Sequence, residues 1–261
     1  MIPTDTAIEL HNLTVTYDSK PAIWNLDYSL PGGQLIGVVG PNGSGKSTML
    51  KTIMGLIQPD SGYVRLFGAP LEEVRQRVAY VPQRTSVDWD FPVSVLDTVL
   101  MGRYRPGNLL RRNTRQDREA ALEALRKVQL EPLRNRQIAR LSGGQQQRVF
   151  IARALAQAAD LYLLDEPFAG VDAATEAAII TLLKDMKAAG KTILVVHHDL
   201  QTVTAYFDSL VLINTRLIAA GPTETVFTAE NIGQTYGGSL SILSQVADLV
   251  GQDKHPIREK H

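Results

Sequence analysis

The sequence predicts an α/β fold with a mostly parallel sheet, and three observations support that prediction. Short apolar segments suited to strands alternate with longer segments of helical periodicity. Two of the apolar segments, residues 35–39 and 161–164, lead directly into residues that suit phosphate and metal binding. Residues 85–158 have a helical pattern, which indicates a helical insertion into the sheet. At 261 residues the chain is long enough to bury a sizeable core.

The first elements are predicted from alternation and from turn residues. A half-buried strand is indicated where apolar residues alternate with threonines, the apolar members being Leu13, Val15 and Tyr17. Pro31-Gly32-Gly33 predicts a turn before the apolar strand at 35–39. A helix is expected to begin near Ser47 and to end before Pro59.

Two more strands and the helical insertion follow. Asp60-Ser61-Gly62 predicts a turn into a strand at 63–67, and a strand at 78–81 is stopped by Pro82. In the insertion, residues 115–128 have the pattern of an amphipathic helix, with an apolar face formed by Ala121, Leu122, Leu125 and Val128. Its arginines suit either a nucleic-acid patch or a solvated face, and the neutral net charge favours the solvated face.

The last third of the chain returns to alternating strands and helices. A helix is predicted at 173–189, with Asp172 as its N-cap and Gly190 just past its end. Strands are predicted at 161–164, 192–196 and 209–213, and a hairpin at 213–217.

The composition excludes several classes of function. The 27 Lys and Arg residues balance 27 Asp and Glu residues, which gives no support for general binding to nucleic acid or anionic membranes. There is no cysteine, so disulfides and thiolate metal sites are excluded. The N-terminus lacks the pattern of a secretory signal, and no stretch reaches the roughly 18 apolar residues of a membrane span. A membrane role is therefore expected to work through a partner.

The segment Gly40-Pro41-Asn42-Gly43-Ser44-Gly45-Lys46-Ser47, called the phosphate loop below, predicts nucleotide binding. Its glycines let successive backbone N–H groups point at phosphate oxygens. Lys46 supplies a positive charge for the β- and γ-phosphates, and the Ser47 hydroxyl suits Mg²⁺. Thr48 and the start of the following helix add the helix dipole.

Two carboxylates follow the apolar strand at 161–164, at the sheet edge where α/β proteins bind ligands. We expect Asp165 to hold Mg²⁺, directly or through water, and Glu166 to orient an attacking water. Phosphoryl transfer requires mainly positioning and charge neutralisation, so a carboxylate beside the metal is the group it needs. Taken alone, two adjacent acidic residues would also suit a solvated turn.

A second helix start suited to phosphate is Leu141-Ser142-Gly143-Gly144-Gln145, called the signature segment below. Ser142 and Gln145 occupy the positions of a capping box, and a helix N-terminus can bind an anion. Alone, the segment predicts an ordinary helix cap. Together with the phosphate loop and the carboxylate pair, it predicts an ATP held between two copies of the chain, each contributing a different half of the site.

Three single residues complete the candidate site. Gln83, after a strand, suits either a role near Mg²⁺ and the attacking water or an ordinary polar loop. His198 ends a strand near the same sheet edge and suits contact with the γ-phosphate, whereas its neighbour His197 is expected on the opposite face of the strand. Tyr17 suits stacking on adenine or a place in the core.

Together these motifs resemble the ATP-binding subunit of ABC transporters, over about residues 10–236. The matching segments are the aromatic loop at Tyr17, the Walker A loop from Gly40 to Thr48, the Gln83 loop, the signature segment, the Walker B strand ending in Asp165 and Glu166, the D-loop Ala169-Gly170-Val171-Asp172 and the switch His198.

The resemblance implies a P-loop NTPase (RecA-like) core with an N-terminal antiparallel β subdomain and an inserted α-helical subdomain. The ATPase domain would cover residues 1–238, with the core and β subdomain at about 1–84 and 159–238 and the helical subdomain at about 85–158. Residues 239–261 would form a C-terminal tail.

The resemblance also implies the chemistry and its partners. ATP and Mg²⁺ are the expected cofactors, with Ser47, Gln83 and Asp165 at the metal and Glu166, His198 and Gln83 in catalysis. Two ATP molecules would lie in a head-to-tail dimer, each between the Walker A loop of one copy and Ser142, Gly143, Gly144 and Gln145 of the other. Dimer closure would move a membrane permease at the cytoplasmic face, and an extracytoplasmic metal-binding protein would take part indirectly. No nucleic-acid partner is expected.

More narrowly, the chain is similar to the ATPases of bacterial manganese, zinc and iron importers. The similar segments are Val81-Pro82-Gln83-Arg84, Val87-Asp88-Trp89-Asp90-Phe91-Pro92-Val93, Met101-Gly102-Arg103-Tyr104 and His197-His198-Asp199-Leu200. Manganese is our first expectation, and a zinc or iron-chelate importer is the alternative. A soluble ABC ATPase acting on DNA or ribosomes is disfavoured, because no tandem ATPase domain, coiled coil or zinc module is visible.

Overall fold

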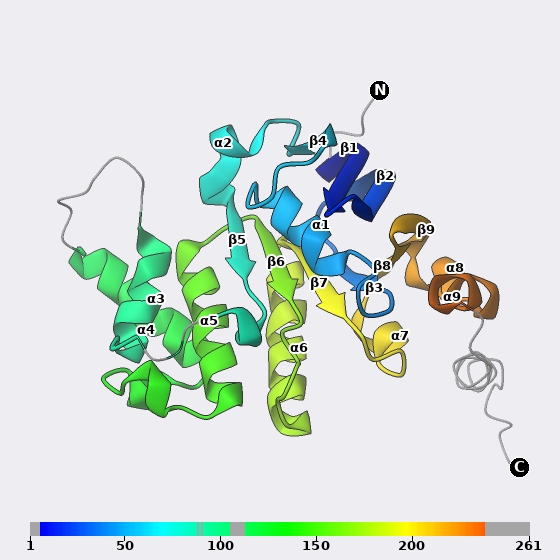
Figure 1. Ribbon diagram of the computed structural model, residues 1–261. Coiled ribbons are helices and arrows are strands. Elements are labelled where there is room, and N and C mark those ends of the chain that lie inside the picture. The colour runs from blue at the N-terminus through cyan, green and yellow to red at the C-terminus, as the bar shows by residue number, and fades with distance from the viewer. Residues whose placement is uncertain (1–5, 88, 90, 105–112, 238–261) are drawn as a thin grey trace, which may run out of the picture. The chain divides into compact units, whose positions relative to one another are not determined.

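A computed structural model of the chain describes residues 6–87, 89, 91–104 and 113–237 (Figure 1). Asp88, Asp90 and the tail from Gly238 to His261, which the sequence analysis singled out, lie outside the described residues. The chain divides into two compact units. The first unit comprises Met1–Ile8, Leu30–Gln34 and Arg65–Val195, and the second comprises Glu9–Ser29, Leu35–Val64 and Val196–His261.

An N-terminal sheet of three strands lies mostly in the second unit, in the order β2-β1-β4. Its strands are β1 (Thr6–Tyr17), β2 (Lys20–Pro31) and β4 (Ser61–Leu66). β1 and β2 form an antiparallel hairpin, because the two linking residues, Asp18 and Ser19, have φ values of 47° and 65°, as in a type I′ turn. The predicted alternation is confirmed for Leu13 and Val15, which are buried while Thr14 and Thr16 are half-buried. Tyr17 departs from it, because its side chain is exposed at the end of the strand.

The second unit also contains the strand that leads into the phosphate loop. β3 (Leu35–Val39) is buried along its whole length and pairs in parallel with β8 (Ser209–Asn214), Ile36 lying opposite Ser209. β9 (Arg216–Pro222) then pairs antiparallel with β8, which confirms the predicted hairpin, and a bulge falls between Leu212 and Ile213. The helices of this unit are α1 (Lys46–Ile53), α7 (Val203–Tyr206), α8 (Thr223–Val226) and α9 (Ala229–Tyr236).

The first unit contains a second parallel pair of strands. β5 (Val78–Val81) pairs with β6 (Leu161–Asp165), Val78 lying opposite Leu161. α6 (Ala173–Ala188) follows β6, and the Asp172 side chain caps it by accepting from the Thr175 N–H at 2.8 Å, as predicted. β7 (Thr192–His197) begins in this unit and ends in the second.

Helices fill the middle of the first unit, as the sequence predicted for residues 85–158. α3 (Val95–Leu100), α4 (Arg115–Lys127) and α5 (Gly143–Gln157) pack against one another (Figure 1). The remaining helices are α2 (Leu71–Val74) and the 3-10 turns Arg75–Arg77, Arg84–Ser86, Met101–Arg103, Glu131–Leu133 and Ile138–Arg140.

The surface of α4 agrees with the solvated-face interpretation of its arginines. Arg126 is bonded to three carboxylates, those of Glu119, Glu123 and Glu131, at 3.0–3.2 Å. The apolar face is shifted slightly from the prediction, since Ala124 is buried whereas Leu122 is only half-buried. The predicted amphipathic helix is otherwise confirmed.

Candidate functional site

The phosphate loop connects β3 to α1 in the second unit, and two of its glycines are required by close contacts. A Cβ on Gly40 would lie 2.0 Å from the carbonyl oxygen of Ile213. A Cβ on Gly45 would lie 2.3 Å from the carbonyl oxygen of Ala22, and Gly45 also has a φ of +97°. Any side chain at these positions would displace main-chain atoms, so the loop depends on glycine there.

The Lys46 ammonium and the Ser44 hydroxyl are both buried within the loop. The Lys46 ammonium donates to the carbonyl oxygens of Gly40 and Pro41 at 2.8 and 2.7 Å, and its side chain is buried. Ser44 Oγ is buried without a hydrogen-bond partner in the described part of the chain. No side chain caps the first turn of α1. A buried cation, an unpaired hydroxyl and an uncapped helix start together suit an anion such as a nucleotide phosphate.

The turn between β8 and β9 braces the loop through main-chain atoms. The Thr215 N–H donates to the Ser44 carbonyl at 2.9 Å, and the Trp24 N–H donates to the Thr215 carbonyl at 2.7 Å. Thr215 has a φ of +60°, so the turn carries its own backbone strain. The conformation of the loop is therefore held by two chain segments distant in sequence.

Three aromatic or imidazole residues of the candidate site lie in the second unit. Tyr17 is 49% exposed at the end of β1, so the alternative of a place in the core is wrong and its ring is accessible for stacking. His197 and His198 differ in exposure: His197, the last residue of β7, is 1% exposed, whereas His198, just after the strand, is exposed.

His197 is held in an aromatic and polar environment. Its Nε2 is 2.7 Å from Thr202 Oγ1, and the rings of Phe207 and Tyr206 lie 5.3 and 6.0 Å from its own. Burial lowers the pKa of His197 to about 4, so the imidazole is neutral at neutral pH. Its hydrogen bond to Thr202 anchors the segment that begins with His198.

The carboxylate pair and Gln83 lie together in the first unit. Asp165, the last residue of β6, is buried, and Glu166 follows with a φ of +49°. The left-handed conformation is uncommon for glutamate and turns its side chain away from the strand direction. Gln83 Nε2 donates to Glu166 Oε2 at 2.8 Å. The structure therefore joins two residues that the sequence could connect only through the resemblance.

Sequence reasoning missed Tyr80, which donates a hydrogen bond to the Asp165 carboxylate. Burial, together with the charge of Asp165, raises the pKa of Tyr80 above its ordinary value. Tyr80 stands on β5 opposite Leu163 of β6. The only signal for Tyr80 in the sequence is its hydroxyl group within an otherwise apolar strand. The contact itself depends on strand pairing, which brings the Tyr80 and Asp165 side chains together.

The signature segment opens α5 with the predicted capping box. The Gln145 N–H donates to Ser142 Oγ at 3.3 Å, and the Ser142 N–H donates to Gln145 Oε1 at 3.0 Å. A Cβ on Gly144 would lie 3.6 Å from Thr175 Cγ2 and 3.7 Å from Val171 Cγ1. The signature segment thus contacts the start of α6, beside the cap residue Asp172.

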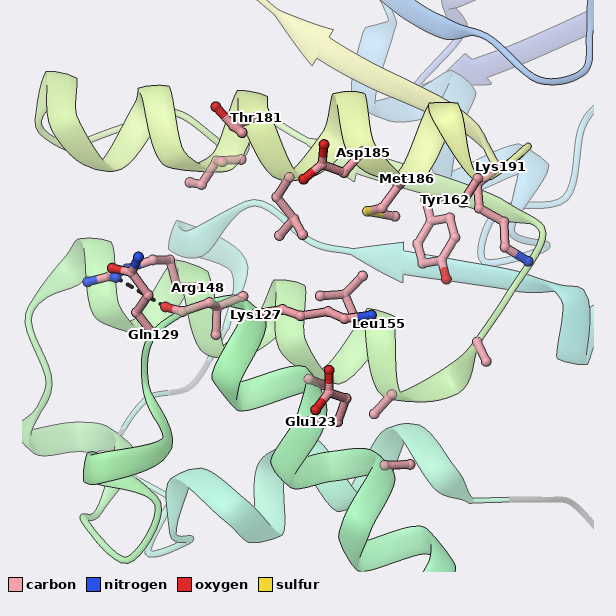
Figure 2. Close-up of a pocket in the computed structure, with 18 of the residues that line it drawn as sticks. Glu123, Lys127, Gln129, Arg148, Leu155, Tyr162, Thr181, Asp185, Met186 and Lys191 are labelled. Atoms are coloured by element: carbon pink, nitrogen blue, oxygen red, sulfur yellow. Dashed lines mark hydrogen bonds between the residues drawn. The ribbon is translucent and has the colours of Figure 1, made fainter.

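A cavity of about 740 Å³ lies in the first unit, between α4 and α5 on one side and α6 on the other (Figure 2). Figure 2 shows Lys127 of α4 and Leu155 of α5 on one wall, and Asp185 and Met186 of α6 opposite them. Tyr162 of β6 also lines it. None of the predicted nucleotide or catalytic residues lines this cavity, so it is not the predicted site.

The described residues contain neither a membrane-spanning helix nor a cluster of metal-ligating side chains. No helix in this part of the chain is long and apolar enough to cross a membrane. In the same residues, no group of three or more histidine, cysteine or acidic side chains is arranged to hold a metal ion.

The chain is similar to known proteins in family, sequence and structure. The family model for ABC transporters matches residues 23–169. The manganese transport system ATP-binding protein MntB of Bacillus subtilis is 57% identical over 236 residues, which cover 90% of this chain and 94% of MntB. The zinc transport system ATP-binding protein TroB of Treponema pallidum is 54% identical over 238 residues, covering 91% and 90% of the two chains.

The solved structures include ATP-binding cassettes with the same fold. A dimeric post-hydrolysis state of the cassette MJ0796, bound to ADP and phosphate, superposes with a TM-score of 0.72 and 30% identity, covering 82% of this chain and 98% of MJ0796. The predicted fold class, a mostly parallel P-loop core with an N-terminal antiparallel sheet and added helices, is confirmed.

Proposed function

This chain belongs to the ABC transporter family, and from that membership we propose that it is the ATP-hydrolysing subunit of an importer for a divalent transition metal. Manganese is the first choice, because MntB is 57% identical; zinc, the substrate named for TroB, is the alternative. The observation that carries the proposal is the presence in one chain of a braced phosphate loop, the Gln83–Glu166 pair and a separate capped signature segment.

We propose a head-to-tail dimer with two ATP sites at its interface. Residues Gly40 to Thr48 of one copy would bind the phosphates, and Tyr17 would stack on the base. Ser142 to Gln145 of the second copy would complete each site through the start of α5. The dimeric, ADP-bound state of the related MJ0796 cassette supports this arrangement.

Mg²⁺ is expected with the nucleotide, and the chemistry of the candidate donors suits it. Ser47, Gln83 and Asp165 offer hydroxyl, amide and carboxylate oxygens, which are the ligands that Mg²⁺ prefers. When bound, the ion would neutralise charge on the β- and γ-phosphates. Tyr80 holds the Asp165 carboxylate by a hydrogen bond, which limits its rotation.

Glu166 is the proposed general base. It would orient a water and accept its proton while the oxygen bonds to the γ-phosphorus and the bond to the β–γ bridging oxygen breaks, giving ADP and phosphate. Gln83 holds the Glu166 carboxylate at 2.8 Å in the free chain. His198, exposed beside the buried His197, would contact the γ-phosphate. These roles complete the proposed catalytic set.

A membrane permease is the proposed partner, engaged from the cytoplasmic face. Phe91, Met101 and Tyr104 follow Gln83 in the helical part of the first unit, and we propose that their exposed side chains contact the permease. The division proposed is a core with a β subdomain at about 1–84 and 159–238 and a helical subdomain at about 85–158. An extracytoplasmic metal-binding protein would act through the permease.

The proposed function is tested with the chain co-purified with its permease. ATPase activity is measured in liposomes with the substrate-binding protein and manganese, zinc or iron. Stimulation by manganese above the other two supports the first choice, and equal stimulation contradicts it. Glu166→Gln should abolish hydrolysis and trap an ATP-bound dimer, detected by light scattering. A Glu166→Gln variant that stays monomeric with ATP and Mg²⁺, with or without the permease, contradicts the dimer.

A further inference from the structure

Two adjacent residues after β5 bind to two different parts of the candidate site. Gln83 donates to Glu166 at 2.8 Å. Arg84 turns the other way, and its Nε donates to Gln146 Oε1 on α5 at 3.1 Å. Arg84 also lies against the signature segment, since a Cβ on Gly143 would be 3.1 Å from Arg84 Cζ. One short segment thus contacts both the proposed general base and the signature segment.

Gln146 connects Arg84 to the turn that carries the signature segment. Its side chain is buried, and its Nε2 donates to the carbonyl oxygen of Ile138 at 3.2 Å. Ile138 precedes the signature segment and Gln146 follows it, so this amide side chain closes the turn that carries Leu141 to Gln145. Arg84 therefore binds the residue that holds this turn together.

The contact with Arg84 is the first of four along one face of α5. Gln146, Phe150, Arg153 and Gln157 follow at intervals of four, three and four residues, which places them on one side of a helix. Phe150 packs edge-on against Trp89 at 5.0 Å between ring centres. Arg153 donates to the Tyr80 carbonyl at 3.3 Å, and Gln157 donates to the Val78 carbonyl at 2.7 Å. This face, called the β5 seam below, joins α5 to β5 and to the segment after it.

The opposite face of α5 is packed less densely. Arg148 and Leu155, seven residues apart, point away from the β5 seam and line the cavity of about 740 Å³ (Figure 2). α5 also packs against α3 and α4, but the cavity beside Arg148 and Leu155 leaves it room for a small shift that does not compress a dense core. A movement of the segment after β5 would therefore pull on α5 through the β5 seam.

We infer that Arg84 is a positioning residue that sets the signature segment relative to Gln83. On the proposed function, Gln83 and Glu166 serve the ATP site of their own chain, whereas the signature segment completes the site of a second copy. Arg84 then links the two ATP sites of the dimer through the hydrogen bond to Gln146. This inference rests on the proposed ATPase function, and it adds a coupling residue that contacts neither nucleotide.

The first test is a double-mutant cycle in the full transporter complex. Arg84→Met and Gln146→Leu are each expected to lower kcat for ATP about tenfold while leaving KM within about twofold, because the phosphate loop is untouched. The kcat of the double variant should be no lower than that of either single variant, since both substitutions remove the same hydrogen bond. Arg84→Lys, which keeps a donor, should restore part of the rate. Arg126→Met, which removes a surface arginine bonded to three carboxylates, is the matched control and should keep wild-type kinetics.

The second test follows the segment after β5 by tryptophan fluorescence. The chain has two tryptophans, so Trp24→Phe leaves Trp89, whose Nε1 donates to the Arg84 carbonyl at 2.9 Å, as the only reporter. In a Trp24→Phe, Glu166→Gln background, ATP with Mg²⁺ should shift Trp89 emission as the dimer forms. With Arg84→Met added, the emission shift should persist at saturating protein, while half-maximal dimerisation should need at least fivefold more protein. Arg84→Lys should need less protein than Arg84→Met, because it keeps a donor.

The outcomes separate the inference from the proposed function. If the wild-type complex does not hydrolyse ATP, the proposed function fails. If it does hydrolyse ATP, the positioning role of Arg84 is overturned by either of two results. The first is that Arg84→Met keeps wild-type kcat and dimerisation. The second is that the losses of kcat in Arg84→Met and Gln146→Leu multiply in the double variant. Should Arg84→Met fold poorly by circular dichroism, the same comparison is made with Arg84→Lys and Gln146→Leu, and wild-type kinetics in both would equally overturn it.

Discussion

Replacing His197 with glutamine is expected to make the stability of the protein less sensitive to acid. His197 is 1% exposed, and burial lowers the pKa of its imidazole from 6.5 to about 4. The unfolded chain therefore binds this proton more readily than the folded chain does. The neutral imidazole contributes its full stability above pH 6.5, and that contribution is lost as the pH falls from 6.5 toward 4.

The gap between the two pKa values sets the size of the effect. This gap corresponds to a full contribution of about 3 kcal/mol to the free energy of unfolding, of which about 2 kcal/mol should be lost between pH 7.5 and pH 5. Glutamine does not titrate and still offers an amide to Thr202. The His197→Gln variant is expected to start less stable than the wild type, because the ring no longer packs against Phe207, but to lose less stability on acidification.

The assay is urea unfolding followed by circular dichroism at pH 7.5 and pH 5. The quantity compared is the change in the free energy of unfolding between the two pH values, which should be about 2 kcal/mol smaller in His197→Gln. Phe207→Leu is the control, since it disturbs the same packing and keeps the imidazole. Identical pH dependence in wild type and His197→Gln would refute the reasoning that burial holds this imidazole neutral.

Three further changes probe the candidate site. Gly45→Ala should abolish ATP binding in calorimetry, because its Cβ would meet a main-chain oxygen at 2.3 Å. In Gly43→Ala the new Cβ has no heavy atom within 4 Å, so the free energy of ATP binding should weaken only by the roughly 1–2 kcal/mol that the positive φ costs. Equal losses of affinity in the two variants would contradict the steric argument. Tyr80→Phe removes the hydrogen bond to Asp165 and should weaken Mg²⁺-dependent ATP binding about threefold to tenfold, with binding of ATP without Mg²⁺ unchanged; a loss in both conditions would count against a role through Asp165. Lys46→Ala should lower ATP affinity at least tenfold in the same titration, and unchanged affinity would argue against the assignment of the phosphate loop.

Local signals in the sequence were sufficient for many elements. β3 and β5 have the bounds predicted for them, because each is a short apolar run that ends at a glycine or a proline. The sequence predicts that α6 ends at Ala189, and the helix ends at Ala188, because Asp172 and Gly190 mark its two ends chemically. Motif spacing likewise predicts the phosphate loop, and the close main-chain contacts at Gly40 and Gly45 agree with the glycines it requires.

Contacts between distant segments could not be predicted in the same way. Arg84 and Gln146 are 62 positions apart, and nothing in either local pattern selects the other as a partner. Tyr80 reaches Asp165 because β5 pairs with β6 in one particular register. Periodicity assigns a residue to a face of its own strand or helix, but the partner on that face depends on how the chain packs.

The brace between the phosphate loop and the β8–β9 turn has a consequence for the tolerance of this region to change. The hydrogen bonds that connect Ser44, Thr215 and Trp24 use backbone atoms alone. Many residue types in the turn can therefore be exchanged without loss of the brace, so homologues are free to diverge there in side-chain chemistry. Chain length is a different matter, because removing or adding one residue between β8 and β9 would move the Thr215 amide away from its acceptor. Insertions and deletions, more than substitutions, should be the rare events in this hairpin.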